Sequence, residues 1–285
     1  MKENIMLILK GFALGIANVI PGVSGGTIAV ILGIYEKLID ILSNLKTKLK
    51  ENFKYLLFLA IGLILAIGLF SNAVTFCLKN YPFATILFFI GFIIGGMPPL
   101  LNKVKSKIDI KSVICFIIAF TVVMLMAFIT PDTMNKSLDI INIKTLIRLF
   151  NFVNSLIGVL GAASMVLPGI SGSFVLMLIG YYEPIMNSIS EFTKLNNLTH
   201  NILILAMFGL GVLFGIIFMA KLIKILLEKY EIPMYMGIIG FVIASAISIL
   251  VSVIGSSYGV LQIIIGVILM FIGIIASRMI SKGEK

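Results

Sequence analysis

Six long apolar runs alternate with short polar segments along the 285 residues of the chain. A helix needs about 20 residues to cross the hydrocarbon core of a bilayer, and every run approaches or exceeds that length. The pattern therefore predicts six membrane-spanning helices. They cover residues 55–78, 83–101, 112–130, 202–227, 233–254 and 258–281.

Two further apolar segments, residues 5–42 and 152–190, are interrupted in the middle. The interruptions read Pro-Gly-Val-Ser-Gly-Gly at residues 21–26 and Pro-Gly-Ile-Ser-Gly-Ser at residues 168–173. Proline ends a helix because it lacks a backbone donor and clashes with the preceding turn, while glycine permits a sharp reversal. Each segment is therefore either a re-entrant helical hairpin, which enters and leaves the membrane on one side, or a single kinked span.

The two interrupted segments are copies of one another at a constant offset of 147 residues. A pair of Gly/Pro-interrupted segments at matching positions is typical of transporters. The chain therefore divides into two repeats, residues 1–146 and 147–285, each with one interrupted segment and three spans. The matched pairs are Pro21 and Pro168, Gly22 and Gly169, Ser24 and Ser171, Gly25 and Gly172, Glu36 and Glu183, Gly62 and Gly209, and Gly68 and Gly215.

The composition is that of a membrane protein. Hydrophobic residues make up 60% of the chain and charged residues 12%, against roughly 45–50% and about 25% in soluble domains. Since so little charge cannot cover a soluble fold of this size, the apolar excess must face lipid. A water-soluble enzyme, a disordered chain and a disulfide scaffold are excluded. The net charge of +10 does not indicate a nucleic-acid partner, because the basic residues lie in short breaks between apolar runs.

The distribution of Lys and Arg distinguishes hairpins from kinked spans. With hairpins, 17 of the 22 basic residues fall on one side of the membrane and 5 on the other, whereas kinked spans divide them 12 to 10. The positive-inside rule favours hairpins, with both termini cytoplasmic. Three crossings per repeat then invert the second repeat relative to the first. The sequence thus predicts an all-α polytopic protein of the cell membrane, with two inverted-topology repeats that each contain a re-entrant hairpin and three transmembrane helices.

The turns of the two hairpins, which we call the tips, have features that suit an anion. Each arm of about 16 residues reaches roughly 24 Å into a core of about 30 Å, so the tips can meet near the midplane. Ser24 and Ser171 fall where the N-cap of each second arm belongs. The backbone N–H groups that follow, together with the helix dipole, favour phosphate especially. The alternative is that the turns serve only close packing against neighbouring spans.

Four charged residues stand out in or beside these segments. Glu36 and Glu183 are candidates for proton coupling, because intramembrane carboxylates commonly titrate; alternatively they are interfacial and end the apolar arm. Lys10 is expected to snorkel to the cytoplasmic interface or to attract an anionic headgroup. Arg148 precedes the second hairpin on the outer side, where it can meet a phosphate. The ATP-binding pattern GxxxxGK[ST] does not occur, so we expect transport that is passive or coupled to H⁺ or Na⁺, with no cofactor and no metal site.

The Gly-x-Ser-Gly pattern of the tips also resembles the nucleophile motif of intramembrane serine proteases of the rhomboid type. His200 is the one imidazole in the chain, and two symmetric tips cannot share it. Catalysis by Ser171 with His200 is therefore the less favoured alternative. We expect no catalytic residues and no enzyme.

The run from Asn18 to Thr27, followed by Gly-Ile-Tyr-Glu at residues 33–36, resembles the family catalogued as domain of unknown function 368. Residues 167–173 resemble the second motif of that family, and the resemblance covers essentially the whole chain. Members are implicated in returning undecaprenyl phosphate, the lipid carrier of cell-wall polymers, from the outer to the inner leaflet. The resemblance thus implies a polyprenyl-phosphate transporter. Its partners are then the lipid substrate and the surrounding membrane lipids.

A secondary transporter of a small soluble anion would have the same architecture and is kept as an alternative. The two tips need not contribute equally, because Ser173 stands where the first tip has Gly26. The candidate substrate-binding residues are Asn18, Pro21, Gly22, Ser24, Gly25, Gly26, Thr27, Pro168, Gly169, Ser171, Gly172, Ser173 and Arg148.

Overall fold

The computed structural model describes residues 2–19, 23–105, 108–128, 143–194, 198–254 and 258–281, and the secondary structure of these residues is helical. Six of the helices are long and apolar enough to cross a membrane, and each begins and ends within four residues of a predicted span. The chain is therefore a multi-pass membrane protein. The six helices are α5 (Phe53–Asn80), α6 (Pro82–Val104), α7 (Ile110–Phe128), α11 (Leu198–Lys229), α12 (Glu231–Ile254) and α13 (Val260–Ser281).

Each interrupted segment forms three helices. In the first segment they are α1 (Lys2–Val19), α2 (Gly25–Ile31) and α3 (Tyr35–Ser43), after which α4 (Leu45–Glu51) follows. In the second segment they are α8 (Ile143–Val166), α9 (Gly172–Leu178) and α10 (Tyr182–Thr193). The arm after each tip was expected to be one continuous helix. It consists instead of two short ones.

A glycine with positive φ causes this break in both arms. Gly33 has a φ of 73° and Gly180 a φ of 74°, which is the left-handed conformation that glycine adopts without strain. The N–H groups of residues 33 and 34 donate 3.0 Å hydrogen bonds to carbonyls of α2, and residues 180 and 181 close α9 in the same way. This is the Schellman motif. As a result, Glu36 and Glu183 each lie in the first turn of a new helix.

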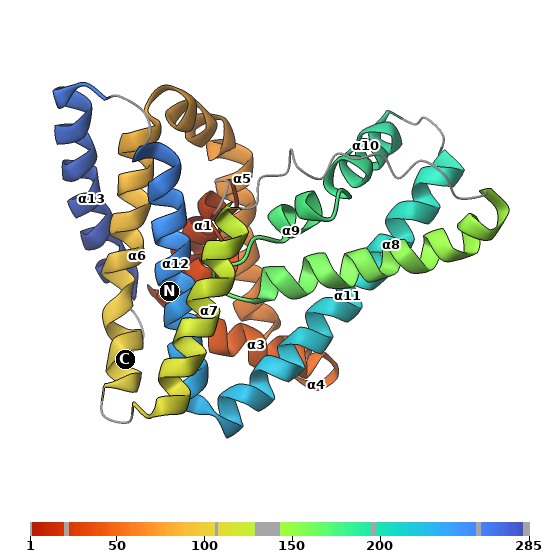
Figure 1. The fold of residues 1–285 in the computed structure, drawn as a ribbon, viewed down its shortest axis with the longest axis horizontal. Coiled ribbons are helices and arrows are strands. Elements are labelled where there is room, and N and C mark those ends of the chain that lie inside the picture. The colour runs from red at the N-terminus through yellow and green to blue at the C-terminus, as the bar shows by residue number, and fades with distance from the viewer. Residues whose placement is uncertain are drawn as a thin grey trace.

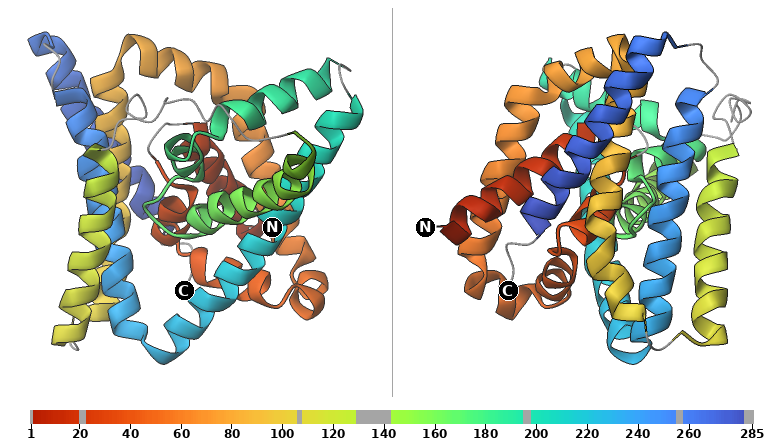
Figure 2. Two further views of the ribbon diagram at one scale, coloured as in Figure 1. Left: turned by 45° about the vertical axis from the view of Figure 1, so that its right-hand side comes forward. Right: turned by 90° about the vertical axis from the view of Figure 1, so that its left-hand side faces the viewer.

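The long helices pack in a pattern that is alike in the two halves. α1 packs against α5, and α8 packs against α11. The remaining four, α6, α7, α12 and α13, form a group in which α6 contacts α13 and α7 contacts α12 (Figures 1 and 2). The contacts between α6 and α13 and between α7 and α12 each join a helix of the first half to a helix of the second. The buried α2 lies between this group and α1, with contacts to α6 and to α8.

Glycines bring the paired helices close together. A Cβ atom placed on Gly11 would lie 2.0 Å from the carbonyl oxygen of Leu59 in α5. A Cβ atom on Gly158 would lie 2.3 Å from the carbonyl oxygen of Phe208 in α11. Small residues allow this approach, which helices in lipid use because they gain no hydrophobic driving force from one another.

The glycine contacts of α5 and α11 correct two of the sequence matches. A Cβ atom on Gly62 would lie 2.0 Å from the carbonyl oxygen of Ile8, and one on Gly211 would lie 1.9 Å from that of Ser155. Gly209, which the 147-residue offset pairs with Gly62, has nothing within 4 Å. The match of Gly62 with Gly209 is therefore wrong by two residues. The match of Gly68 with Gly215 is wrong as well, because Gly68 has nothing within 4 Å whereas a Cβ atom on Gly215 would lie 2.7 Å from the carbonyl oxygen of Val159. The chain from Glu183 to Gly211 is two residues longer than the chain from Glu36 to Gly62, and packing accordingly pairs Gly62 with Gly211.

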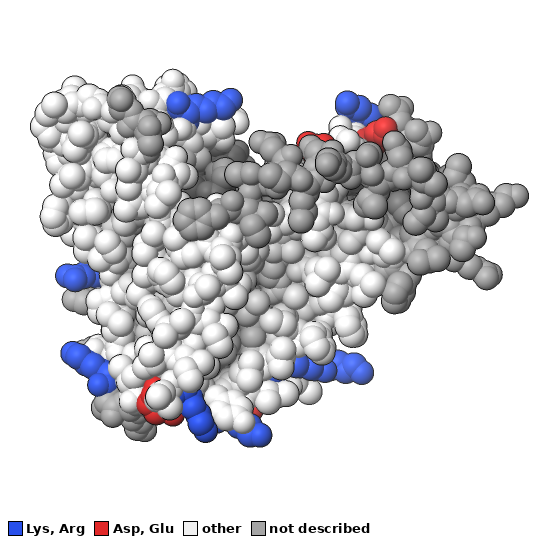
Figure 3. All heavy atoms as spheres, viewed as in Figure 1, with Lys and Arg blue, Asp and Glu red and all other residues white. Residues whose placement is uncertain are grey.

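The surface divides into charged edges and an apolar band. Figure 3 shows most of the described Lys, Arg, Asp and Glu side chains of this face along its lower and upper edges, with uncharged residues between them. Within the spans, large apolar side chains such as Ile64 and Leu69 are exposed. An exposed apolar band of this kind indicates a lipid environment, because the free energy of exposing so much apolar surface to water is unfavourable.

Candidate functional site

The two tips are in direct contact. The backbone N–H of Gly169 donates a 2.7 Å hydrogen bond to Oγ1 of Thr27, which is fully buried. The hydroxyl of Ser24 donates a 3.4 Å hydrogen bond to the carbonyl oxygen of Leu167. The predicted meeting of the two tips is therefore present, and the two copies of the motif form one structural unit.

A third hydrogen bond fixes α3 to this unit. The hydroxyl of Tyr35, the first residue of α3, donates a 3.0 Å hydrogen bond to the carbonyl oxygen of Val166, the last residue of α8. Tyr35 is buried, so the bond is protected from water. The start of α3 consequently lies beside the second tip.

The glycines of the tips do not all have the same role. A Cβ atom on Gly26 would lie 3.2 Å from the carbonyl oxygen of Leu167, and one on Gly172 would lie 2.7 Å from that of Gly161. The contact at Gly172 leaves no room for a side chain and the contact at Gly26 is tight, so these two glycines serve close packing, as the packing alternative proposed. A Cβ atom on Gly25 would instead meet only the side chain of Asn18, at 3.0 Å. Gly25 is thus the tip glycine whose replacement changes the neighbouring space without a backbone clash.

The two tip serines occupy the predicted N-cap positions of α2 and α9 but do not make the capping hydrogen bond. Ser24 bonds across to the other tip, and Oγ of Ser171 lies 2.8 Å from Oγ of Ser173. The hydroxyls therefore link the tips or one another, and the first backbone N–H groups of α2 and α9 remain without a serine cap.

Both tips line one cavity of about 670 Å³. Small-molecule pockets have volumes of about 300–1,000 Å³, so the cavity can hold a headgroup with a part of its chain. The rest of its wall is mostly apolar and comes from the six helices of the two interrupted segments and from α11. The tip residues in the wall, with their neighbour in α1, are Asn18, Ser24, Gly25, Gly26, Ser171, Gly172 and Ser173.

The other predicted binding residues lie elsewhere. Thr27, Pro168 and Gly169 are buried where the tips join and do not line the cavity. Arg148 belongs to α8, but its side chain lies outside the described part of the structure. Pro21 and Gly22 both lie outside the described residues, so their predicted roles stay predictions.

The two matched glutamates have different surroundings. Glu36 forms an ion pair with Lys103 of α6 and accepts a hydrogen bond from the hydroxyl of Tyr235 in α12. Partial burial raises the pKa of Glu36, but the hydrogen bonds from Lys103 and Tyr235 outweigh it and hold the pKa below its ordinary value. Glu183 is exposed on α10 and, like Glu36, does not line the cavity. The sequence match between the two therefore does not extend to their partners.

Lys10 is fully buried within α1. The expectation that it snorkels to the cytoplasmic interface is therefore wrong, and the alternative that it attracts an anionic headgroup stays a prediction. The close approach of α1 to α5 through Gly11 covers this part of the helix.

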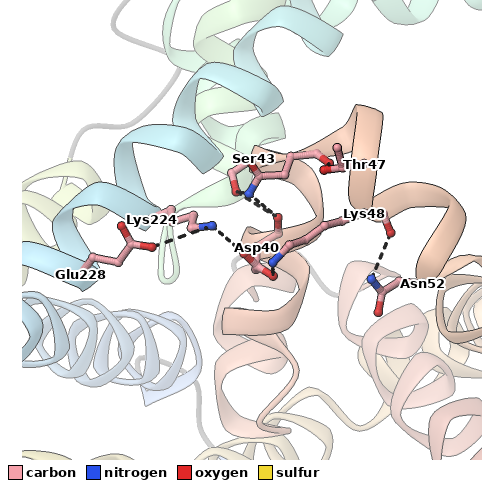
Figure 4. A network of polar contacts seen from close by, with 8 residues as sticks. Asp40, Ser43, Thr47, Lys48, Asn52, Lys224 and Glu228 are labelled. Carbon is pink, nitrogen blue, oxygen red and sulfur yellow. Dashed lines mark hydrogen bonds and ion pairs between the residues drawn. The ribbon is translucent and has the colours of Figure 1, made fainter.

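A charged network joins the first interrupted segment to the second half of the chain (Figure 4). Asp40 of α3 pairs with Lys48 of α4 and, at 2.7 Å, with Lys224 of α11. Lys224 also lies 3.8 Å from Glu228. Sequence reasoning missed this network, because Asp40 and Lys224 are far apart in the chain. The one available signal was that each is a charge next to a long apolar run.

The serine-hydrolase alternative requires a base beside Ser171, and His200 is the one imidazole in the chain. The described partner of the Ser171 hydroxyl is Ser173, and the side chain of His200 lies outside the described part. Among the described residues, no group of three His, Cys, Asp or Glu side chains is placed to hold a metal ion.

Comparison with known proteins gives a consistent family assignment. Residues 14–263 match the model of the VCA0040-like family, described as undecaprenyl phosphate translocase-like. The chain is 32% identical over 245 residues to a polyprenyl-phosphate transporter of Staphylococcus aureus, covering 85% of this chain and 84% of that protein. It is 29% identical over 238 residues to a polyprenyl-phosphate transporter of Vibrio cholerae, covering 78% and 70% respectively. No solved structure matches the chain.

Proposed function

This chain belongs to the undecaprenyl phosphate translocase-like family, and we propose that it carries polyprenyl phosphate from the outer to the inner leaflet of the cell membrane. One observation carries the proposal beyond family membership. Two copies of a Pro-Gly-x-Ser-Gly motif, one from each half of the chain, meet around a single cavity. A site shared by two halves can be approached from either side of the membrane in turn, which transport requires.

The architecture in this proposal is a pair of inverted repeats with re-entrant hairpins and cytoplasmic termini. The equivalent helix pairs, the two Schellman motifs and the 17-to-5 division of basic residues support it. The short tip helices support it as well. α2 and α9 have seven residues each, and roughly 10 Å of helix cannot cross a core of about 30 Å.

The tips hold the phosphate in this proposal. A phosphate monoester carries about −1.5 to −2 charges at pH 7, and moving it through a medium of low dielectric constant is costly unless donors surround it. The residues that line the cavity include Ser171 and Ser173, which carry hydroxyls, Asn18, which carries an amide, and the first residues of α2 and α9. The second tip contributes one hydroxyl more than the first, because Gly26 has no side chain.

Direction requires a source of energy, and we assign proton coupling to Glu183 and Glu36. Glu183 takes up a proton on the outer face, where it is exposed. Glu36 releases one on the cytoplasmic face, since the ion pair with Lys103 favours its carboxylate form. Na⁺ is the alternative coupling ion. In that case the transport rate should follow a Na⁺ gradient and not a pH gradient.

The apolar wall of the cavity favours a lipid over a small soluble anion, which would need polar groups on all sides. The expectation of transport without enzymatic activity agrees with the names of both relatives. The test of function uses proteoliposomes with undecaprenyl phosphate in both leaflets and an external phosphatase that cannot cross the membrane. We expect the protein to make the inner-leaflet pool accessible to the phosphatase. An inner pool that stays protected with correctly folded protein contradicts the proposal.

A further inference from the structure

The cavity extends away from the tips along one side of α3. We propose that this groove binds the first part of the isoprenoid chain of the lipid whose phosphate lies at the tips, and that the corresponding face of α10 does not. The inference rests on the proposed function, because it assigns a second subsite to the same ligand. Four residues of α3 form the groove: Tyr35, Leu38, Ile39 and Leu42.

The spacing of these residues gives the groove a direction. Positions three, four and seven apart lie on one face of a helix, so the four side chains form a continuous stripe. The hydroxyl of Tyr35 is bonded to the carbonyl of Val166, which places this end of the stripe at the tips. Leu42 lies seven residues further, or roughly 10 Å along the helix axis. The stripe therefore leads from the polar end of the cavity to an apolar one.

The opposite wall is apolar and adaptable. Ile216 of α11 lines the same cavity, together with Met165 and Met177. Methionine side chains are flexible and fill irregular space, which suits a branched chain that is not of fixed shape. α3 packs against α11, and the ion pair between Asp40 and Lys224 lies across this contact (Figure 4).

The matching face of α10 shares only the first position of the stripe. Tyr182, which matches Tyr35, lines the cavity, but the later positions of that face do not, so the groove continues along α3 alone. The 147-residue offset pairs Ile39 with Met186 and Leu42 with Ile189. Neither Met186 nor Ile189 lines the cavity, and their exposed fractions are 45% and 41%. The position that matches Asp40 is Asn187, which has no carboxylate to pair with a lysine. The two halves are thus alike at the tips but different along the helices that follow.

The cavity size limits how much of the chain is bound. A volume of about 670 Å³ is that of a pocket for a small molecule, and it includes the space at the tips. The groove therefore takes the units next to the phosphate, and the remainder of the chain stays in the bilayer. Affinity should rise with chain length over the first units and then level off.

The test compares two substitutions at matched positions. Leu42→Trp fills the groove, and Ile189→Trp places the same side chain on the exposed face of α10. Dissociation constants are measured for inorganic phosphate, farnesyl phosphate and undecaprenyl phosphate, with purified protein in nanodiscs of zwitterionic lipid. We expect Leu42→Trp to weaken farnesyl phosphate binding by about tenfold, which corresponds to the loss of roughly two buried methylene groups. Ile189→Trp should bind it like the unmodified protein.

The outcomes separate the subsite from the function. Equal affinity of the unmodified protein for farnesyl phosphate and inorganic phosphate overturns the chain subsite, and so does an equal loss in both variants, while transport of polyprenyl phosphate stands. If no prenyl phosphate binds to the unmodified protein, the proposed function fails as well. Leu42→Gln provides a second variant if the tryptophan variant does not fold, and its polar side chain should weaken binding in the same direction.

Discussion

Gly169 donates its backbone N–H to the side chain of Thr27, and this bond is the shortest of three described hydrogen bonds that join the two halves of the chain at their tips. Gly169 has a φ of 83°, and a Cβ atom there would lie 2.6 Å from the carbonyl oxygen of Phe241. Its position therefore tolerates no side chain. Thr27 is the partner that can be varied, since its hydroxyl is the part that makes the contact.

Thr27→Val should destabilise the joined tips. Valine keeps the shape of threonine but leaves the buried N–H of Gly169 without an acceptor, which costs about 1–3 kcal/mol. Thr27→Ser keeps the hydroxyl and is the control, with less than half of the loss expected. Thermal unfolding in detergent measures both. Equal unfolding temperatures for the valine and serine variants would show that the hydrogen bond contributes nothing.

Gly25→Leu should abolish transport without unfolding the protein. A Cβ atom at this position meets only the side chain of Asn18, and Gly25 lines the cavity at the first tip, so a larger side chain there should occupy the cavity. Gly172→Leu is less informative, because its Cβ atom would already lie 2.7 Å from the carbonyl oxygen of Gly161. Gly209→Leu is the control, since Gly209 faces open space. The phosphatase assay in proteoliposomes measures the rate. Transport at the control rate by folded Gly25→Leu protein excludes the tip as the phosphate site.

Asp40 and Lys224 should contribute a small, pH-dependent stabilisation. Both side chains are about one third exposed, and exposed pairs contribute roughly 0.2–1 kcal/mol. Hydrogen bonds from Lys224 and Lys48 lower the pKa of Asp40. A lowered folded-state pKa means that the contribution is complete above the unfolded pKa of about 3.9 and is lost as the pH falls through the folded value.

A double-mutant cycle with Asp40→Asn and Lys224→Met isolates this pair. The coupling energy at pH 7 should exceed that at pH 3, because acid protonates Asp40. Glu228→Gln is the control and should leave the coupling energy between Asp40 and Lys224 largely unchanged. Glu228 lies 3.8 Å from Lys224, whereas Asp40 accepts a hydrogen bond from it. A coupling energy that does not change between the two pH values contradicts the assignment.

The long apolar runs made the spans predictable, because length and hydropathy alone set them, and the repeated motif predicted that the tips would meet. The break at Gly33 was missed, since a glycine inside an apolar run does not reveal its φ angle. The pairs Glu36–Lys103 and Asp40–Lys224 were missed for another reason. They depend on how helices that are distant in sequence are placed, and no local pattern encodes that placement.

Labelling of single cysteines should locate the loops relative to the membrane. In a background without the two native cysteines, a cysteine at Lys46 or Lys105 should be protected from an impermeant thiol reagent in intact cells. One at Lys79 or Lys194 should react. Permeabilised cells provide the control, because all four positions should then be labelled. Labelling of positions 46 and 105 on opposite faces would rule out the hairpins, and the inverted symmetry with them.

Glu183→Gln should abolish the response of transport to a pH gradient and leave lipid binding largely intact. Glutamine keeps the size and polarity of the side chain but cannot exchange a proton, and Glu183 is exposed on α10 at the predicted outer face. The rate is measured in proteoliposomes with an imposed gradient, and binding with undecaprenyl phosphate in nanodiscs. Glu191→Gln, on the same helix, is the control and should respond as the unmodified protein does. If Glu183→Gln also responds fully, Glu183 is an interfacial residue and the coupling group lies elsewhere.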